Sequence, residues 1–290
     1  MKSAAAVAIA VLLAACSGGG GSQTLPPAGP PPPGPAAAER SLTMVTPFTA
    51  IDRQTGAVLR VFPPREVVAS LRRTQATSST NLVYGGGPVQ TAPHLYVVYW
   101  GATWLTTGDP SGVRARLEAF YPAIGGHAWL NSVTQYTQSD GSHAGNAGNV
   151  FSGSYVDSSS SPLPVVTQSQ LAAEAAKAAA HFGDTTASAA YVVVTPHNVT
   201  TPGFMVQFCA YHSTTAAANG ATIAWTALPY MPDAGSSCGQ GSVNTPGTLD
   251  GVTIVAGHEQ GEIETDPQPS TGWVDASGSE NGDKCAWTGL

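Results

Sequence analysis

The sequence predicts a single α/β or α+β domain in which a mixed sheet is flanked by helices. From about residue 81 onward, short apolar runs rich in β-branched and aromatic residues alternate with stretches of helical character. That alternation favours helices packed on a sheet. Roughly two hundred residues take part, which is enough for one hydrophobic core.

The N-terminus has the features of a bacterial lipoprotein signal. A basic start at Lys2 precedes an apolar run over residues 4–15 that is too short to cross a bilayer as a mature helix. Leu13-Ala-Ala-Cys16 then forms a lipobox, so we expect lipidation of Cys16 and a membrane anchor. Ser17 after the cysteine favours the outer membrane if the cell is Gram-negative. An ordinary signal peptide is the alternative.

Two segments separate this signal (residues 1–16) from the main domain. Residues 17–40 are rich in glycine and proline and predict a tether without secondary structure. Residues 41–80 form a transition segment, with a strand expected at 57–61 and a helix at 65–73. The segment could also be a prosegment. Its basic residues predict solvated positions on a peripheral element: Arg60, Arg65, Arg72 and Arg73.

The first half of the main domain, residues 81–290, contains three expected strands. They lie at 94–100, 150–156 and 191–195. Asp109-Pro110 predicts the start of a helix that runs to about residue 121, and 128–138 could be a short helix or strand. Thr167-x-x-Gln170 forms a capping box that opens an alanine-rich helix, which Gly183 ends.

Two further strand-like runs, 204–211 and 222–228, are joined by a small-residue turn at Asn219-Gly220. They predict a hairpin or an edge strand beside an acidic helix. Zinc peptidases align the substrate backbone along such an edge strand. His212, at the end of the first run, would then approach a metal ion as a ligand or substrate contact.

The acidic, zincin-like helix is the most informative stretch. An apolar run at 252–256 continues into His258-Glu259-x-x-Glu262, and Pro267 ends the helix near Asp266. His258 and Glu262 are four residues apart and share a face, so both could bind one ion. Glu259 lies to the side, where His-Glu-x-x-His peptidases place the general base.

The remaining ligands and the metal stay open at this point. Because a glutamate replaces the second histidine, zinc is the first candidate and calcium the alternative. A third ligand could come from Asp266, Glu280 or Asp283. The competing interpretation is a helix end with surface acids and an ordinary histidine.

The cysteines predict one disulfide. With Cys16 lipidated, Cys209, Cys238 and Cys285 remain in an exported protein. Cys209 with Cys238 is the first pairing to consider, and a link from either to Cys285 is the alternative.

Three ordered blocks carry a family resemblance. They are Tyr84-Gly-Gly-Gly-Pro88, Phe208-Cys-Ala-Tyr-His212, and Gly257-His-Glu-x-x-Glu262 followed by Asp266-Pro267, Gly272-Trp273 and Glu280-x-x-Asp283-x-Cys285. Over residues 81–290 the chain resembles the Exordium or phosphate-induced family, secreted proteins of plant cell walls that also occur in bacteria. The resemblance implies an extracellular location and names no reaction.

The composition argues against one class of function, nucleic-acid binding. A formal net charge of −7 with 11 Lys and Arg excludes the basic stripe that nucleic-acid binding needs. Taken together, the lipobox and the His258-Glu259-x-x-Glu262 pattern predict an exported, lipid-anchored, metal-dependent hydrolase of the cell envelope. A zinc metallopeptidase that acts on a peptide or envelope polymer is the leading form. The alternative is a non-catalytic envelope or adhesion protein with a structural cation site.

Overall fold

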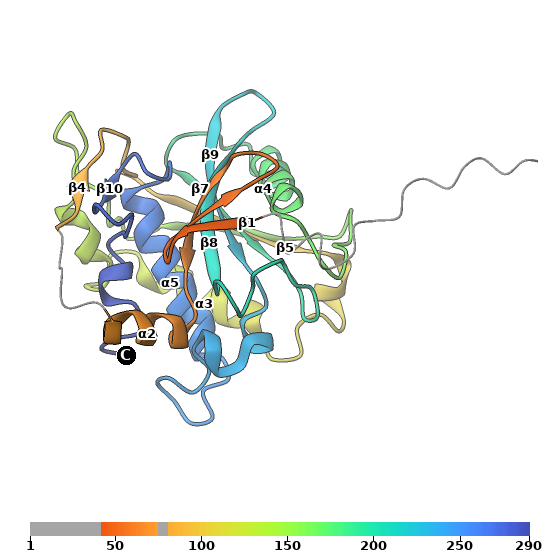
Figure 1. Ribbon diagram of the computed structural model, residues 1–290. Helices are drawn as coiled ribbons and strands as arrows, with labels where there is room; N and C mark the ends of the chain where they lie inside the picture. Colours follow the sequence, from red (N-terminus) through yellow and green to blue (C-terminus); the bar gives the residue numbers. More distant parts are fainter. Residues whose placement is uncertain (1–41, 75–80) are drawn as a thin grey trace, which may run out of the picture. The chain divides into compact units, whose positions relative to one another are not determined.

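The computed structural model describes residues 42–74 and 81–290, and confirms the predicted mixed α/β class (Figure 1). Eight strands form one sheet in the order β1-β2-β3-β8-β9-β7-β5-β6. The predicted signal with Cys16 and the tether at 17–40 lie outside the described residues. Within 42–74 and 81–290, every helix is too short or too polar to span a membrane.

Residues 42–62 belong to the main sheet, although the sequence set them apart as a transition segment. β1 (Leu42–Thr46), β2 (Thr49–Asp52) and β3 (Val58–Phe62) run antiparallel, and β3 pairs with β8. Helix α2 (Arg65–Thr74) follows, so the predicted strand and helix of this segment are confirmed. β3 joins the core because four of its five residues are buried.

The other half of the sheet is largely parallel. β5 (His94–Trp100) lies between β6 (Phe151–Asp157) and β7 (Ala189–Val194), and β7 pairs in parallel with β9 (Thr222–Leu228). All three strands expected in the first half of the domain are therefore present. A separate two-stranded sheet joins β4 (Val83–Tyr84) to β10 (Trp273–Val274).

Two helices connect the parallel strands. α3 (Val113–Ile124) begins later than predicted, because the Asp109 carboxylate caps it from outside by accepting the N–H groups of Val113 (2.7 Å) and Arg114 (3.0 Å). In α4 (Gln168–Phe182) the capping box and the Gly183 terminus are as expected. Four 3-10 helices lie within the described ranges: η1 (Ala102–Leu105), η2 (Leu130–Gln135), η3 (Met231–Cys238) and η4 (Asp283–Cys285).

The hairpin is real, but its first strand was misplaced. β8 is Ala210–Ala216, because the backbone at 203–208 closes a turn on itself, with Gln207 N–H donating to the Gly203 carbonyl (2.7 Å). The edge-strand expectation is also wrong. β8 pairs with β3 on one side and β9 on the other, and β9 pairs with β7, so the hairpin occupies the middle of the sheet.

Helix α5 (Asp250–Thr265) is the predicted acidic helix, and it lies beside β8 (Figure 1). Side chains alternate across a strand, so the register decides what faces α5. His212 pairs with Arg60 of β3, and the His212 imidazole contacts Glu259 of α5. The opposite face of the sheet is covered by α4, where Phe182 packs against Tyr96.

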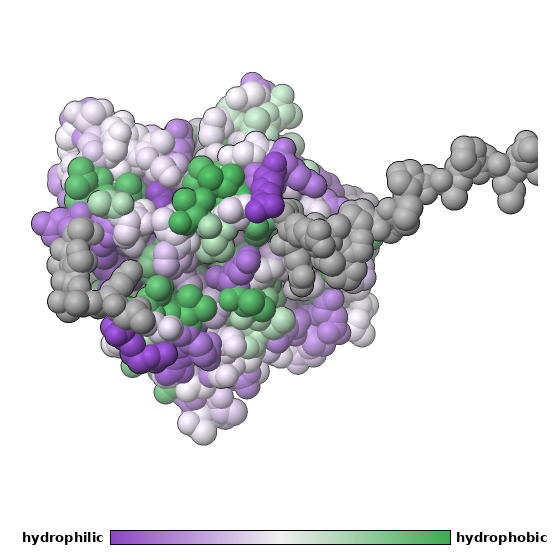
Figure 2. All heavy atoms as spheres, in the orientation of Figure 1, coloured by the Kyte–Doolittle hydropathy of each residue, from purple (hydrophilic) through white to green (hydrophobic). Residues whose placement is uncertain are grey.

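On the face shown in Figure 2, apolar side chains of the described residues form separate patches between polar ones. Apart from the neighbours Met205 and Val206, the large exposed apolar side chains of the described residues are single positions spread along the sequence from Val45 to Leu290. Single apolar residues at the surface are ordinary in folded proteins. The surface therefore points less clearly to a function than the interior does.

Candidate metal centre

Helix α5 buries residues that proteins normally expose. His258 is 9% exposed, and Glu259, Glu262 and Glu264 are each at most 1% exposed. Taking ionised carboxylates out of water costs several kcal/mol per group unless a cation or hydrogen bonds compensate. The acids of this helix therefore need a compensating group, and the interpretation as surface acids does not fit.

One group of side chains, the His258 cluster, comprises His258, Glu262 and Asp283. Nε2 of His258 lies 2.9 Å from Oε1 of Glu262 and 3.6 Å from Oδ1 of Asp283. The other Asp283 oxygen accepts the backbone N–H of Glu280 at 2.9 Å, which fixes the carboxylate. His258 and Glu262, which are four residues apart on α5, thus lie together with Asp283, one of the three predicted candidates for the third ligand.

Aromatic stacking holds the His258 ring. The imidazole lies parallel to the Phe62 ring, with centroids 3.7 Å apart, and Phe62 stacks in turn on Trp287 at 4.6 Å. Phe62 ends β3 and Trp287 lies near the C-terminus, so two distant segments orient this imidazole. Neither contact is visible in the sequence pattern.

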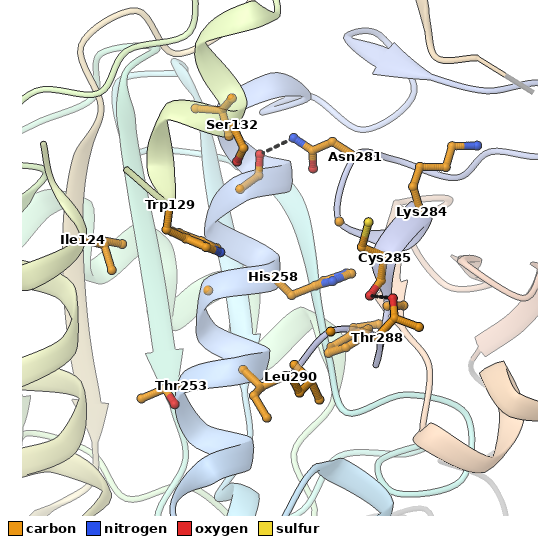
Figure 3. A pocket seen from close by; sticks show the side chains of 18 of the residues that line it. Ile124, Trp129, Ser132, Thr253, His258, Asn281, Lys284, Cys285, Thr288 and Leu290 are labelled. Carbon is orange, nitrogen blue, oxygen red and sulfur yellow. Dashed lines mark hydrogen bonds between the residues drawn. The ribbon is translucent and has the colours of Figure 1, made fainter. Parts of the chain in front are cut away.

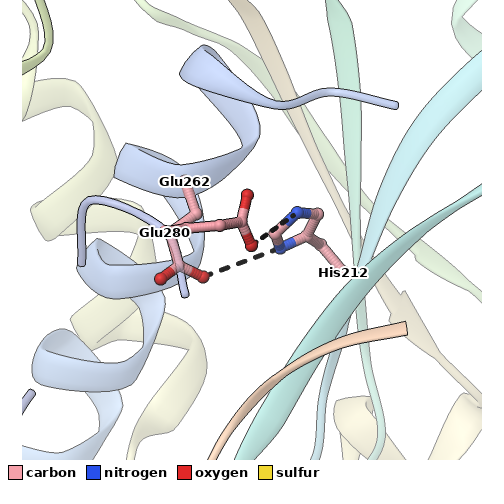
Figure 4. A group of neighbouring side chains, drawn as sticks. All are labelled: His212, Glu262 and Glu280. Atoms are coloured by element: carbon pink, nitrogen blue, oxygen red, sulfur yellow. Dashed lines mark ion pairs between the residues drawn. The ribbon is translucent and has the colours of Figure 1, made fainter. Parts of the chain in front are cut away.

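A second group, the His212 cluster, comprises His212, Glu262 and Glu280 (Figure 4). Nε2 of His212 lies 3.6 Å from Oε2 of Glu280, and Nδ1 lies 3.9 Å from Oε2 of Glu262. Nδ1 also lies 3.1 Å from Oε2 of Glu259. β8 thereby brings His212 to the acidic helix, as the sequence suggested.

Asp266 belongs to neither cluster. Its carboxylate accepts backbone N–H groups from Ser270 (2.7 Å), Thr271 (3.1 Å) and Gly272 (2.6 Å). These bonds use both oxygens to shape the turn after α5. Of the predicted ligands, the structure assigns Asp266 to the turn and brings the others together.

Arg60 is a site residue, although the sequence predicts a solvated position for it. It is 2% exposed, and its Nε lies 3.7 Å from Oε2 of Glu280 and 3.8 Å from Oδ2 of Asp266. Its solvated position was therefore predicted wrongly. The strand pattern of β3 gave no sign of this role, because only the pairing of β3 with β8 brings Arg60 next to His212.

Asn281 and Gly282 complete the C-terminal side of the site. Asn281 Nδ2 donates to the Gly261 carbonyl (2.9 Å) and to Thr265 Oγ1 (3.2 Å), which ties this segment to α5. A Cβ at position 282 would lie 2.8 Å from Nδ1 of His258 and 2.9 Å from Oε1 of Glu262. Only a glycine leaves the His258 cluster its space.

Burial dominates the protonation of these groups. It raises the pKa of Glu262 to about 8 and lowers the pKa of His258 to about 4. Burial, reinforced by neighbouring carboxylates, raises the pKa of Glu259, Glu280 and Asp283 well above the usual range. A divalent cation would reverse this balance, because it favours ionised carboxylates and neutral imidazoles.

The donor atoms fit a cation. In each cluster, one ligand atom per residue lies within 4.8 Å of the other two. Considering only 42–74 and 81–290, the buried atoms without a hydrogen-bond partner include Nε2 of both His212 and His258, Oε1 of Glu262, Oδ1 of Asp283 and both carboxylate oxygens of Glu280. Buried polar atoms are normally satisfied, so their convergence needs an explanation.

A cavity of about 820 Å³ leads to the His258 cluster (Figure 3). His258 points into it from α5, and Gly282 also lines it. The cavity's aromatic lining is Phe62, Phe120, Trp129, Tyr136 and Trp287. Glu259, Glu262 and Asp283 are not lining residues, so access from this side passes the imidazole.

The cysteines resolve as first expected. Cys209 and Cys238 form a disulfide that links the residue before β8 to η3, which packs on α5. Cys285 is exposed, carries a free thiol and lines the cavity near His258. The alternative disulfide, from Cys285 to Cys209 or Cys238, is therefore absent from this structure.

No protein-family model matches the chain, and no match was found among curated proteins or solved structures. The resemblance to the Exordium family therefore stays a prediction. Only the geometry of the site therefore bears on function.

Proposed function

We propose that this chain is an exported metal-dependent hydrolase, and most specifically a zinc peptidase, whose metal is bound by His258, Glu262 and Asp283. One observation carries the proposal. Nε2 of His258, Oε1 of Glu262 and Oδ1 of Asp283 are buried, face only one another within the described residues, and converge behind the imidazole, which lines a cavity of about 820 Å³. One imidazole and two carboxylates are ligand types that zinc uses, with one histidine fewer than the His₂Glu set of catalytic zinc peptidases.

Zinc suits this donor set better than calcium. Calcium prefers six to eight oxygen ligands and rarely uses imidazole, whereas each cluster here contributes a histidine nitrogen. Bound zinc would supply Lewis acidity toward a scissile carbonyl.

Glu259 is the proposed general base. Its Oε2 lies 3.1 Å from Nδ1 of His212, which would orient the carboxylate, while Oε1 has no hydrogen-bond partner within the described chain. In the ionised form Oε1 would accept a proton from the attacking water. The pKa of Glu259 is raised by burial, so this role requires the positive charge of a neighbouring cation.

The aromatic lining suggests the substrate class. Phe120 and Trp129 would contact an apolar side chain beside the scissile bond. Because β8 and β9 lie inside the sheet, the substrate backbone would not add to them as a further strand. The proposed substrate is a peptide, or the peptide part of an envelope polymer. A lipid on Cys16 would hold the protein at the membrane, close to such substrates.

The test compares zinc content and peptide hydrolysis in the full-length chain. His258→Ala and Asp283→Asn should each lower bound zinc and abolish hydrolysis of a mixed peptide library. Glu259→Gln should keep the zinc and lose hydrolysis by about 10²-fold or more, as for a lost general base. Glu264→Gln is the matched control, because Glu264 is equally buried on α5 but hydrogen-bonds to Gln260. Full activity in Glu259→Gln would contradict the proposal.

The alternative, a non-catalytic envelope protein with a structural cation, is favoured by one feature. Glu259, Glu262 and Asp283 do not line the cavity, and the C-terminal segment meets β8 through Glu280 and α5 through Asp283. A cation there would fasten this segment. In that case removing zinc lowers the melting temperature, and neither the wild type nor Glu264→Gln hydrolyses any peptide.

A further inference from the structure

We infer that the His212 cluster binds a second divalent cation, bridged to the first through the carboxylate of Glu262. This inference rests on the proposed metal site at His258 only through that shared ligand. It turns a single-ion centre into a two-ion centre.

The first step is that the two ring nitrogens of His212 have different surroundings. Nδ1 lies 3.1 Å from Oε2 of Glu259 and is occupied by that hydrogen bond. Nε2 is buried without a hydrogen-bond partner among the described residues and lies 3.6 Å from Oε2 of Glu280. Buried polar atoms are normally satisfied, so the second cation is placed between Nε2 and Glu280.

The second step concerns Arg60, the nearest protein cation. Nε lies 3.7 Å from Glu280 without forming a hydrogen bond. The two other guanidinium nitrogens donate to Thr49, the Gly278 carbonyl and Ser270. Both oxygens of Glu280 therefore lack a hydrogen-bond partner within the described residues.

The third step is the position of Glu262 between the clusters. Oε1 lies 2.9 Å from Nε2 of His258, and Glu262 also offers a carboxylate oxygen within 4.8 Å of the ligand atoms of His212 and Glu280. Glu262 therefore belongs to both clusters. A carboxylate in this position could bridge two ions, and two-ion sites recur in hydrolases that act on amide and phosphate bonds.

The fourth step is the charge balance. One divalent ion in the His258 cluster would neutralise Glu262 and Asp283, and Arg60 would offset Asp266. Glu259 and Glu280 would remain as buried carboxyl groups with no cation of their own, and ionising them there is costly. A second divalent ion beside His212 and Glu280 would offset both.

The experiment counts zinc in the full-length chain after equilibration with zinc and removal of the excess, by elemental mass spectrometry. Wild type and Glu264→Gln should hold two ions per chain. His212→Gln and Glu280→Gln should each hold one, as should Asp283→Asn, and Glu262→Gln should hold none. The isosteric Glu280→Gln variant keeps the count informative if His212→Gln fails to fold.

Manganese gives a second readout. Two Mn²⁺ ions that share Glu262 should show an exchange-coupled electron paramagnetic resonance spectrum, which becomes the spectrum of an isolated ion in Glu280→Gln. One zinc per chain that is lost in Asp283→Asn but kept in Glu280→Gln would overturn the second ion and leave the first. Loss of all zinc in Glu280→Gln would also overturn the second ion, because Glu280 would then bind the same single ion as the His258 cluster. A wild type without zinc would overturn both proposals.

Discussion

Helices α4 and α5 pack against opposite faces of the same central strands, and they bury different residues. The buried side of α4 is mostly alanine, and its buried acid, Glu174, has the Lys177 ammonium 3.8 Å away. α5 instead buries His258, Glu259 and Glu262 among acceptors that have no hydrogen-bond partner in the described chain. One oxygen of Glu174 also lacks a hydrogen-bond partner among the described residues, but α4 buries this single acid beside a lysine, whereas α5 gathers several such atoms in one place.

We propose from this contrast that α4 contributes mainly to stability and α5 to ligand binding. Burial of ionisable groups without partners lowers stability, so a helix that contains several of them points to a ligand. Metal affinity should then depend on α5 and its partners, and folding stability on both helices. The predictions below test that separation, from the largest expected effect to the smallest.

Glu262→Gln should have the largest effect. This carboxylate is shared by both clusters, so its loss should reduce bound zinc to below one ion per ten chains and abolish hydrolysis. Glu174→Gln on α4 should retain the zinc. Elemental analysis of both variants checks this, and equal zinc in the two would remove the distinction between the helices.

The pH dependence should separate the zinc-free from the zinc-loaded protein. Burial raises the pKa of Glu262 from 4.5 to about 8, so in the zinc-free protein its stabilising, protonated form is lost as the pH rises through about 8. Zinc needs the deprotonated ligand. The melting-temperature difference between the two forms should therefore widen from about pH 6 to about pH 8, as calorimetry would show. A constant difference would contradict deprotonation of a buried ligand.

Asn281→Ala should have an intermediate effect. Its amide ties the segment with Glu280 and Asp283 to the Gly261 carbonyl, so its loss should loosen both ligands. Zinc affinity should fall by roughly 10- to 100-fold, as for other residues that orient ligands. Competition with a chromogenic chelator measures this, and unchanged affinity would show that the segment is positioned without Asn281.

Thr167→Ala should have the smallest effect on the site. It removes the capping box of α4 and should cost about 1 kcal/mol of unfolding free energy. Zinc content should not change. Denaturant titration gives the stability change, and a loss of zinc in this variant would show that α4 also supports the centre.

Local patterns predicted much of the fold. Three predicted features depend only on residues close in sequence, and all are present: the alternation of apolar strands and helices, the capping box at Thr167, and the helix that ends before Pro267. β8 was placed too early because residues 204–208 have strand-like composition but satisfy their backbone within a turn. Propensity alone does not report such bonds.

The candidate site was predicted only in part. The spacing of His258 and Glu262 and the downstream acids are short-range signals, and the structure brings His258, Glu262 and Asp283 together. Arg60 and the Phe62 stack come from a strand some two hundred positions away, and only its pairing with β8 places them. Two clusters could not be foreseen because the position of His212 depends on the sheet register.

The most direct test is anomalous diffraction at the zinc edge from crystals of the protein grown with zinc. The account predicts a peak within bonding distance, about 2.0–2.1 Å, of Nε2 of His258, shared with Glu262 and Asp283. A second peak should lie between His212 and Glu280. An absence of anomalous density at His258, in crystals where zinc is bound elsewhere, would contradict the central claim that helix α5 buries its acids for a metal ion.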